Sequence, residues 1–257
     1  MIRYQFEATV PEGIVAHSSW GYWLYAALNE LVPAEVAETW HQQNAMPFSQ
    51  YFCPGQERRT AHWNITVFSE DTEPELRSVL ESRKELVLRE LSCQLSLRIV
   101  GRNSFPSGGD FLDCAAAAED RRVHTMQIRT PAAFKHNETY QILPDVHQIL
   151  QSLVRRWNQA MPDYPLLDED ALHMLETQIW IQDYRLQSRR FDLKGRRIPG
   201  FTGTIWLRNR LPAPLLEVWK ALLLFGEYAG IGIKTALGMG GISCPELVGQ
   251  LVGSSRK

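Results

Sequence analysis

The segment best suited to bind an anion lies near the C-terminus, where six glycines between Gly226 and Gly241 surround one cation, Lys234. Closely spaced glycines let a backbone present its N–H groups to an anion without obstruction by Cβ atoms. The glycines follow an apolar, helix-like run, whereas a P-loop or dinucleotide fingerprint lies between a strand and the helix it opens. A loop that binds a polyphosphate backbone is therefore favoured, and a nucleotide-phosphate cradle stays open as the weaker alternative. The residues expected to bind are Gly230, Gly232, Lys234, Thr235, Gly238 and Gly240.

A strongly basic stretch precedes this loop. Eight cations and one acid, Asp192, lie from Arg185 to Arg210, which gives a local net charge of +7 in a chain whose total is −2. The stretch reads as strand, turn and strand, with the turn at Lys194 and Gly195. A two-stranded ribbon can align cations along a nucleic-acid groove, although such a run is also typical of a solvated hairpin. The cations expected to line such a groove are Arg189, Arg190, Arg196 and Arg197.

Histidine is the side chain best suited to move a proton near neutral pH, and the chain has seven. His41 ends an amphipathic segment and precedes a polar turn, so it is the first candidate for a general base or acid. A helix-end histidine that binds carbonyl groups is the structural alternative. His17, just ahead of a predicted helix, is the second candidate.

The elements that must position these residues alternate between strands and helices. Strand-like alternation covers 2–10, 61–68, 86–100 and 123–130, a hairpin near 176–192 and 197–207, and a closing strand within 243–252. Helical patterns cover 18–31, 34–41, 73–82, 145–160 and 212–228, and 104–113 is expected to be a loop. Two halves of similar length and content suit two α+β units of the βαββαβ type.

The aromatic residues divide between core and surface. At helical spacing an aromatic stripe is usually core, and this is expected of Trp20, Trp23, Trp157 and Trp219. Tyr51 and Phe52 are either core or a surface that stacks on unpaired bases.

Several segments together resemble the CRISPR repeat-RNA processing endoribonucleases of the RAMP superfamily. They are the apolar helix followed by GIGIKTALGMG, the segments Arg129–Phe134 (RTPAAF) and Asp145–Asn158 (ending RWN), Gly200–Gly203 (GFTG), and Trp40-His41 followed by Pro47–Ser49. This resemblance implies an α+β protein of two tandem ferredoxin-like (RRM-like) domains with a C-terminal glycine-rich loop. The first domain is expected over 1–120 and the second over 121–257.

The resemblance also implies a reaction. It predicts a metal-independent endoribonuclease that cuts CRISPR repeat RNA in precursor transcripts by 2′-OH attack, leaving a 2′,3′-cyclic phosphate, and it assigns proton transfer to His41. Some members add a tyrosine on the preceding helix and a lysine soon after the histidine. Tyr25 lies near that tyrosine position, although an ungapped comparison puts Ala26 there. No lysine follows His41, so Arg58 or Arg59 is the cation expected to stabilise phosphate charge.

Other roles and partners remain open. A catalytically weak repeat-binding subunit of an effector complex is the alternative within RNA binding. Effector-complex subunits and a second copy of the chain are further candidate partners.

Composition narrows the class of protein. The four cysteines show no CxxC pairing and no histidines at zinc spacing, so neither a metal site nor a cofactor is expected. Scattered cysteines suit a reducing compartment. The N-terminal segment has no signal-peptide core, and apolar runs of about five residues are too short to span a bilayer. The sequence therefore predicts a cytoplasmic protein with no membrane partner.

Overall fold

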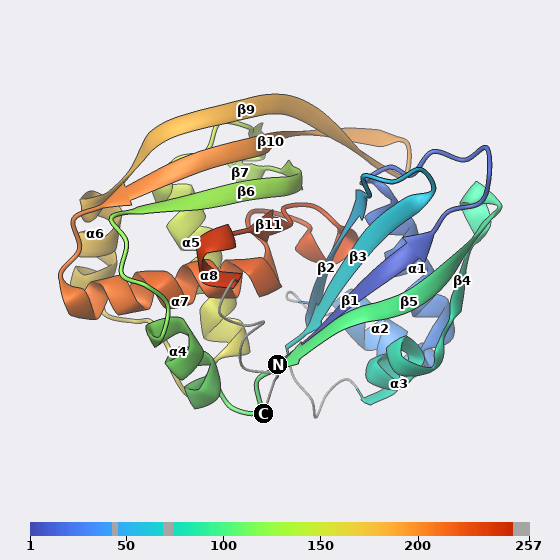
Figure 1. Ribbon diagram of the computed structural model, residues 1–257, viewed down its shortest axis with the longest axis horizontal. Coiled ribbons are helices and arrows are strands. Elements are labelled where there is room, and N and C mark those ends of the chain that lie inside the picture. The colour runs from blue at the N-terminus through green and yellow to red at the C-terminus, as the bar shows by residue number, and fades with distance from the viewer. Residues whose placement is uncertain (43–45, 69–73, 249–257) are drawn as a thin grey trace.

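Two antiparallel sheets stand side by side, and helices cover one face of each (Figure 1). The structure, a computed structural model, describes residues 1–42, 46–68 and 74–248, without the side chains of His41 and Val248. In this part of the chain every helix falls short of the length and apolarity needed to span a membrane.

The first sheet has the strand order β2-β3-β1-β5-β4. Its strands are β1 (Ile2–Thr9), β2 (Phe48–Pro54), β3 (Thr60–Val67), β4 (Glu85–Leu88) and β5 (Cys93–Ser104). Alternate residues of the central strand β1 are buried beneath the helices. These helices are α1 (Trp20–Leu31), α2 (Ala34–Gln42) and α3 (Pro74–Ser82).

The second sheet has the strand order β11-β6-β10-β9. Its strands are β6 (Val123–Ala132), β9 (Ile179–Leu193), β10 (Arg196–Asn209) and β11 (Ile242–Ser243), and its helices are α5 (Val146–Ala160), α6 (Glu169–Gln178), α7 (Ala213–Ala229) and α8 (Pro245–Val248). A small ribbon, β7 (Phe134–His136) and β8 (Thr139–Gln141), lies beside it. In the first sheet β1 lies between β3 and β5, and in the second sheet β6 lies between β10 and β11; with the β4–β5 hairpin counted as one element, both follow the βαββαβ order. The predicted pair of ferredoxin-like units is confirmed.

The stretch expected to be a loop, 104–113, instead contains the start of helix α4 (Gly108–Ala116). Ser107 and Asp110 form a reciprocal capping box at its N-terminus. Phe111 and Ala115 of α4 pack into the core of the second unit, where the Phe111 ring lies 6.4 Å from that of Phe225 on α7. By packing, α4 therefore belongs with the second sheet, although a division at residue 120 would assign it to the first.

Three further expectations differ from the structure. The single strand expected over 86–100 is a hairpin of β4 and β5, because a 3-10 turn (Arg89–Leu91) and the left-handed Ser92 reverse the chain. Helix α6 is not among the predicted elements; it begins at Glu169, after the N-cap Asp168, whose side chain accepts the Ala171 N–H. The closing strand is only β11, and α8 follows it; residues 249–252 lie outside the described chain.

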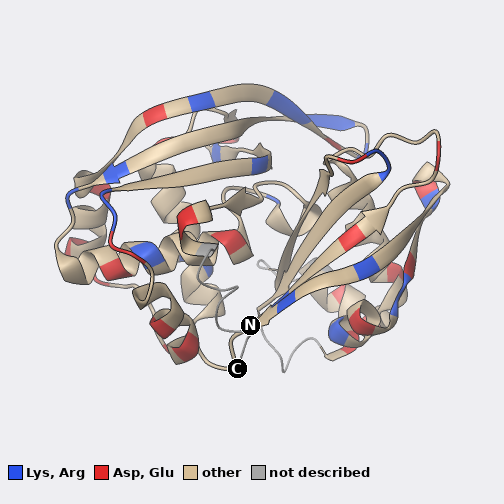
Figure 2. Ribbon diagram, in the orientation of Figure 1, with Lys and Arg blue, Asp and Glu red and all other residues tan. Residues whose placement is uncertain are grey.

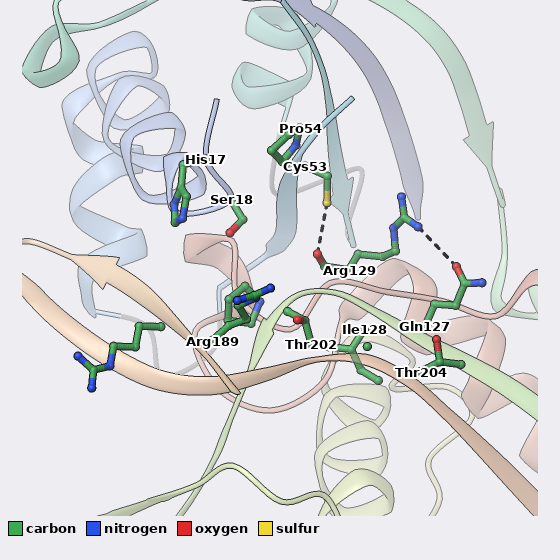
Figure 3. Close-up of a pocket in the computed structure, with 13 residues that line it drawn as sticks. His17, Ser18, Cys53, Pro54, Gln127, Ile128, Arg129, Arg189, Thr202 and Thr204 are labelled. Carbon is green, nitrogen blue, oxygen red and sulfur yellow. Dashed lines mark hydrogen bonds between the residues drawn. The ribbon is translucent and has the colours of Figure 1, made fainter. Parts of the chain in front are cut away.

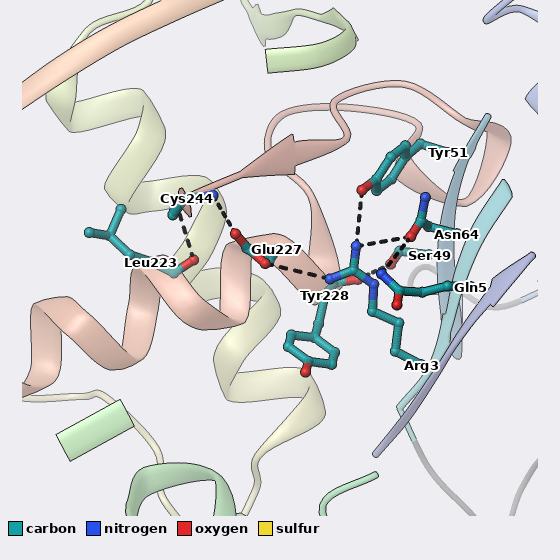
Figure 4. A network of polar contacts seen from close by, with 9 residues as sticks. All are labelled: Arg3, Gln5, Ser49, Tyr51, Asn64, Leu223, Glu227, Tyr228 and Cys244. Atoms are coloured by element: carbon teal, nitrogen blue, oxygen red, sulfur yellow. Dashed lines mark hydrogen bonds and ion pairs between the residues drawn. The ribbon is translucent and has the colours of Figure 1, made fainter. Parts of the chain in front are cut away.

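A buried polar network joins the two units (Figure 4). Arg3 of β1 donates to the Tyr51 hydroxyl at 2.9 Å and to Asn64 Oδ1 at 3.1 Å. Its Nη1 lies 3.6 Å from Glu227 Oε2 on α7. Glu227 also accepts the Cys244 N–H, and burial raises the pKa of its carboxyl to about 7. This network thus connects the central strand of the first sheet to helix α7 of the second unit.

Candidate nucleic-acid interface and active site

The glycine-rich loop is a packing joint between the two units. Its 3-10 helix η2 (Thr235–Leu237) lies against β2 and α1. A Cβ on Gly21 of α1 would lie 2.7 Å from Gly238 Cα, and a Cβ on Gly232 would lie 2.3 Å from the Ala133 carbonyl oxygen. Gly232 and Gly238 have φ of +76° and +102°, values that residues other than glycine rarely adopt. Close packing and backbone conformation therefore require these glycines.

The sequence predicts that the glycine N–H groups of this loop face a phosphate, but in the structure they donate within the protein. The N–H groups of residues 230–233 and 237–241 donate to acceptors within the protein, such as the Pro131 carbonyl for Gly240 and the Ser152 hydroxyl for Gly232. Lys234 is exposed in a left-handed conformation, whereas Thr235 is buried. Contact of this loop with RNA stays a prediction that rests on the Lys234 side chain.

The basic hairpin of β9 and β10 arches from the second unit to the first (Figure 1). Its turn is Lys194-Gly195, as predicted, with φ of +48° and +76°. The Asp192 N–H donates to the Ser19 hydroxyl at 2.9 Å, just before α1. Lys194 Nζ lies 5.7 Å from the ring centroid of Tyr22, and its hydrogen bond with Tyr22 raises its pKa. The hairpin tip is thus docked along α1, and its cations, whose positions are blue in Figure 2, are exposed.

A cleft of about 480 Å³ lies where the hairpin, β6 and the end of β2 meet (Figure 3). Three exposed arginines line it, Arg129 of β6 with Arg189 and Arg190 of β9, and its described lining contains no carboxylate. Hydroxyl and amide groups complete the wall: Ser18, Gln127, Thr202 and Thr204. Guanidinium groups contact phosphates, and neutral donors and acceptors contact sugars and base edges. The lining of the cleft therefore has the groups that a nucleic-acid backbone can contact.

The two candidate histidines lie at different places. His17 is exposed, accepts the Ser19 N–H on Nδ1 at 3.2 Å and lines the cleft beside the end of β2. His41 lies at the C-terminal end of α2, and its neighbour Trp40 packs on Phe48 at the start of β2, with ring centroids 5.0 Å apart. Cys53, which lines the cleft, is five positions beyond Phe48 on β2, a distance of about 17 Å along an extended strand. The structure therefore does not bring His17 and the end of α2 into one site.

Tyr25 lies at the His41 end of this surface. Its ring centroid is 6.2 Å from that of Phe48, and burial raises the pKa of its phenol. Arg58 and Arg59 are exposed at the opposite end, in the turn between β2 and β3, where Arg59 Nε donates to the Val10 carbonyl at 3.0 Å. These two arginines are thus far from the helix that carries His41.

Some residues of this surface were missed from the sequence. Arg129 and Gln127 alternate on β6 with the buried Met126 and Ile128, so strand periodicity could have placed them on the open face. For Lys194 the sequence predicts only a place in a turn. Its approach to α1 depends on the docking of the hairpin, for which the sequence has no signal.

The aromatic expectations are mostly confirmed. Trp20, Trp157 and Trp219 are buried, whereas Trp23 is half-buried. Phe52 is fully buried against Trp20 and has no surface for a base. Its neighbour Tyr51 is half-buried, and its hydroxyl accepts a hydrogen bond from Arg3.

In the described residues there is no cluster of three histidine, cysteine or carboxylate side chains that could hold a metal ion.

Comparisons with known proteins agree with this arrangement. The model of the CRISPR-associated endoribonuclease Cas6 family matches residues 126–242. The chain is similar to the CRISPR-associated endoribonuclease Cas6 of Streptococcus thermophilus, with 31% identity over 220 residues that cover 85% of this chain and 88% of the relative.

Solved structures show the same fold. A Cas6 product complex of Thermus thermophilus superposes with a TM-score of 0.73 at 23% identity and covers 95% of this chain and 100% of its own. A second Cas6 structure, of a variant in which a histidine is replaced by alanine, has a TM-score of 0.68 at 18% identity and covers 95% of this chain and 99% of its own. From the extent of its identity with the S. thermophilus protein, the chain belongs to the family of CRISPR-associated Cas6 endoribonucleases.

Proposed function

We propose that this protein cleaves CRISPR repeat RNA within precursor transcripts, without a metal ion, by attack of the RNA's own 2′-OH. The observation that carries the proposal is the placement of exposed cations, from the three arginines of the cleft to Lys194 where the docked hairpin meets α1. Such a surface suits a polyanion that passes the end of α2, where His41 lies. Because the proposed substrate is a transcript, we place the protein in the cytoplasm.

The chemistry needs two proton transfers. A base removes the 2′-OH proton while the 2′-oxygen bonds to the adjacent phosphorus, and an acid protonates the 5′-oxygen as its bond to phosphorus breaks. The products are a 2′,3′-cyclic phosphate and a 5′-hydroxyl. His41 is proposed for one of these transfers, because an imidazole exchanges protons near neutral pH.

The choice of His41 over His17 rests on its surroundings. Tyr25 and Lys194 both lie on the α1 side of this surface, where a phenol can hydrogen-bond a phosphate oxygen and an ammonium can stabilise developing charge. A histidine-to-alanine variant was also the subject of a solved structure of a similar Cas6 protein. His17, in the cleft with three arginines, is proposed to bind RNA without taking part in cleavage.

The test is cleavage of a labelled repeat RNA by the wild-type protein in excess EDTA, with analysis of the product ends. We expect full activity, a 5′-hydroxyl on one product and a cyclic phosphate, or its opened form, on the other. A 5′-phosphate product, or loss of activity in EDTA that added divalent cations restore, would contradict the proposed chemistry. Tight binding without cleavage would identify a repeat-binding subunit instead.

A further inference from the structure

The open face of the second sheet continues past the cleft and carries two tryptophans, each with an arginine over its ring. Arg185 Cζ lies 5.8 Å from the ring centroid of Trp206. Arg210 Cζ lies 5.2 Å from that of Trp180. Both indoles are half-buried, and both arginines are exposed.

Register assigns these side chains to the open face. Thr204 lines the cleft, and Trp206 is two residues further along β10, so it projects from the same face about 6.6 Å away. The alternate residues Ile205 and Leu207 are fully buried in the core with α5 and α7. Trp180 pairs with Arg208, which makes it a diagonal neighbour of Trp206 at roughly 7–8 Å.

The charge of this end of the face is positive. Among residues 179–185 of β9 and 204–210 at the end of β10, three arginines (Arg185, Arg208 and Arg210) stand against one acid, Asp183. Arg208 is held by a hydrogen bond to Gln182 at 3.1 Å. The hydrophobic core does not need these indoles, because the residues on the opposite face of the same strands form it. A polyanion with flat, unpaired rings complements the pattern, because bases stack on indoles and guanidinium planes while arginines contact phosphates.

We propose that Trp206 and Trp180 form a stacking platform for unpaired nucleotides of the RNA that the neighbouring cleft binds. The platform lengthens the site along β10, away from the hairpin tip, so a single-stranded segment of substrate runs from the cleft over Trp206 to Trp180. The inference rests on the proposed function for its RNA. It adds which part of the RNA is unpaired there and which side chains hold it.

The test compares two RNAs and four proteins by fluorescence anisotropy. The RNAs are a short unstructured oligouridine and a blunt-ended RNA hairpin without unpaired nucleotides. The proteins are the wild type, Trp206→Ala, Trp206→Phe and Tyr184→Ala. Tyr184 is the matched control, because it is exposed on the same strand pair but lies opposite Ile205, on the other face.

We expect Trp206→Ala to weaken oligouridine binding by roughly 5- to 150-fold, the range for loss of one stacked base. Binding of the blunt hairpin should change by less than about twofold, Trp206→Phe should restore most of the oligouridine affinity, and Tyr184→Ala should match the wild type. Thermal unfolding checks that each variant is folded.

Wild-type oligouridine affinity in folded Trp206→Ala would overturn the platform, as would an equal loss for both RNAs. The proposed function is judged separately by wild-type cleavage of repeat RNA. If repeat RNA is cut while Trp206→Ala binds oligouridine normally, the platform is wrong and the function stands. Loss of oligouridine binding in a protein that cuts no repeat RNA would support the platform and refute the function.

Discussion

Replacing Arg3 with methionine should destabilise the protein in a pH-dependent way. Arg3 and Glu227 are 6% and 3% exposed, so removal of the guanidinium leaves a buried carboxyl with hydrogen bonds only from the Cys244 N–H and Ser243 among the described residues. Breaking a buried pair by removing one partner costs about 3–5 kcal/mol. Arg3→Met should lose stability of that order near pH 8.5. At this pH the buried Glu227 carboxyl either stays charged without a partner or takes up a proton at a free-energy cost.

The direction of the pH effect follows from the Glu227 carboxyl. Its pKa in the folded protein, about 7, lies above the ordinary value of 4.5. Its contribution to stability is therefore fully present below about pH 4.5 and is lost as the pH rises through 7. Without Arg3 the folded pKa rises further, because the attraction that favours the carboxylate is gone. The difference between Arg3→Met and the wild type should therefore grow from pH 5 to pH 8.5.

Urea unfolding followed by circular dichroism at about pH 5 and about pH 8.5 measures this difference. The matched control is Arg3→Met combined with Glu227→Gln, which removes both charges and should regain much of the stability at high pH. An equal loss at both pH values, or a larger loss at about pH 5, would refute the assignment of a buried charge pair between the units.

Gly238→Val should lower the free energy of unfolding by about 2–3 kcal/mol, because φ is +102° and the new Cβ would lie 2.8 Å from Gly21 Cα; a urea midpoint equal to that of the wild type would remove the loop from the joint. Neutralising four hairpin cations together should weaken RNA binding and flatten its salt dependence; the four are Arg189, Arg190, Arg196 and Arg197. An unchanged slope of log affinity against log salt concentration would show that the hairpin is merely solvated. His41→Ala should slow single-turnover cleavage by roughly 10²–10⁴-fold with affinity nearly intact, whereas His17→Ala should mainly weaken binding; the opposite pair of results would move the base to the cleft.

Features fixed by local chemistry were predictable from the sequence. The Lys194-Gly195 turn follows from one glycine, which adopts positive φ without strain, between two alternating strands. Helix α5 was predicted almost to the residue, because Asp145 caps it and its apolar positions recur at helical spacing. The buried tryptophans of α5 and α7 followed from the same periodicity.

Features fixed by tertiary contact were not predictable. The glycines of 230–241 suggested an exposed loop, but Gly238 meets Gly21 from a helix more than two hundred residues away in the chain. Helix α4 was missed because two glycines follow its cap, although the capping-box pattern of Ser107 and Asp110 was visible. Arg58 and Arg59 were favoured for nearness to His41 in sequence, whereas the cation on the α1 surface, Lys194, comes from the other unit.

The most direct measurement of the central claim uses a substrate with one atom changed. A repeat RNA with a 2′-deoxy nucleotide immediately 5′ of the mapped cut lacks the proposed nucleophile but retains every phosphate. Wild-type protein should bind it with the affinity of the all-ribose RNA and leave it whole in a single-turnover assay in EDTA. Cleavage of the 2′-deoxy substrate at the same position would mean that water attacks the phosphate, and would contradict the mechanism.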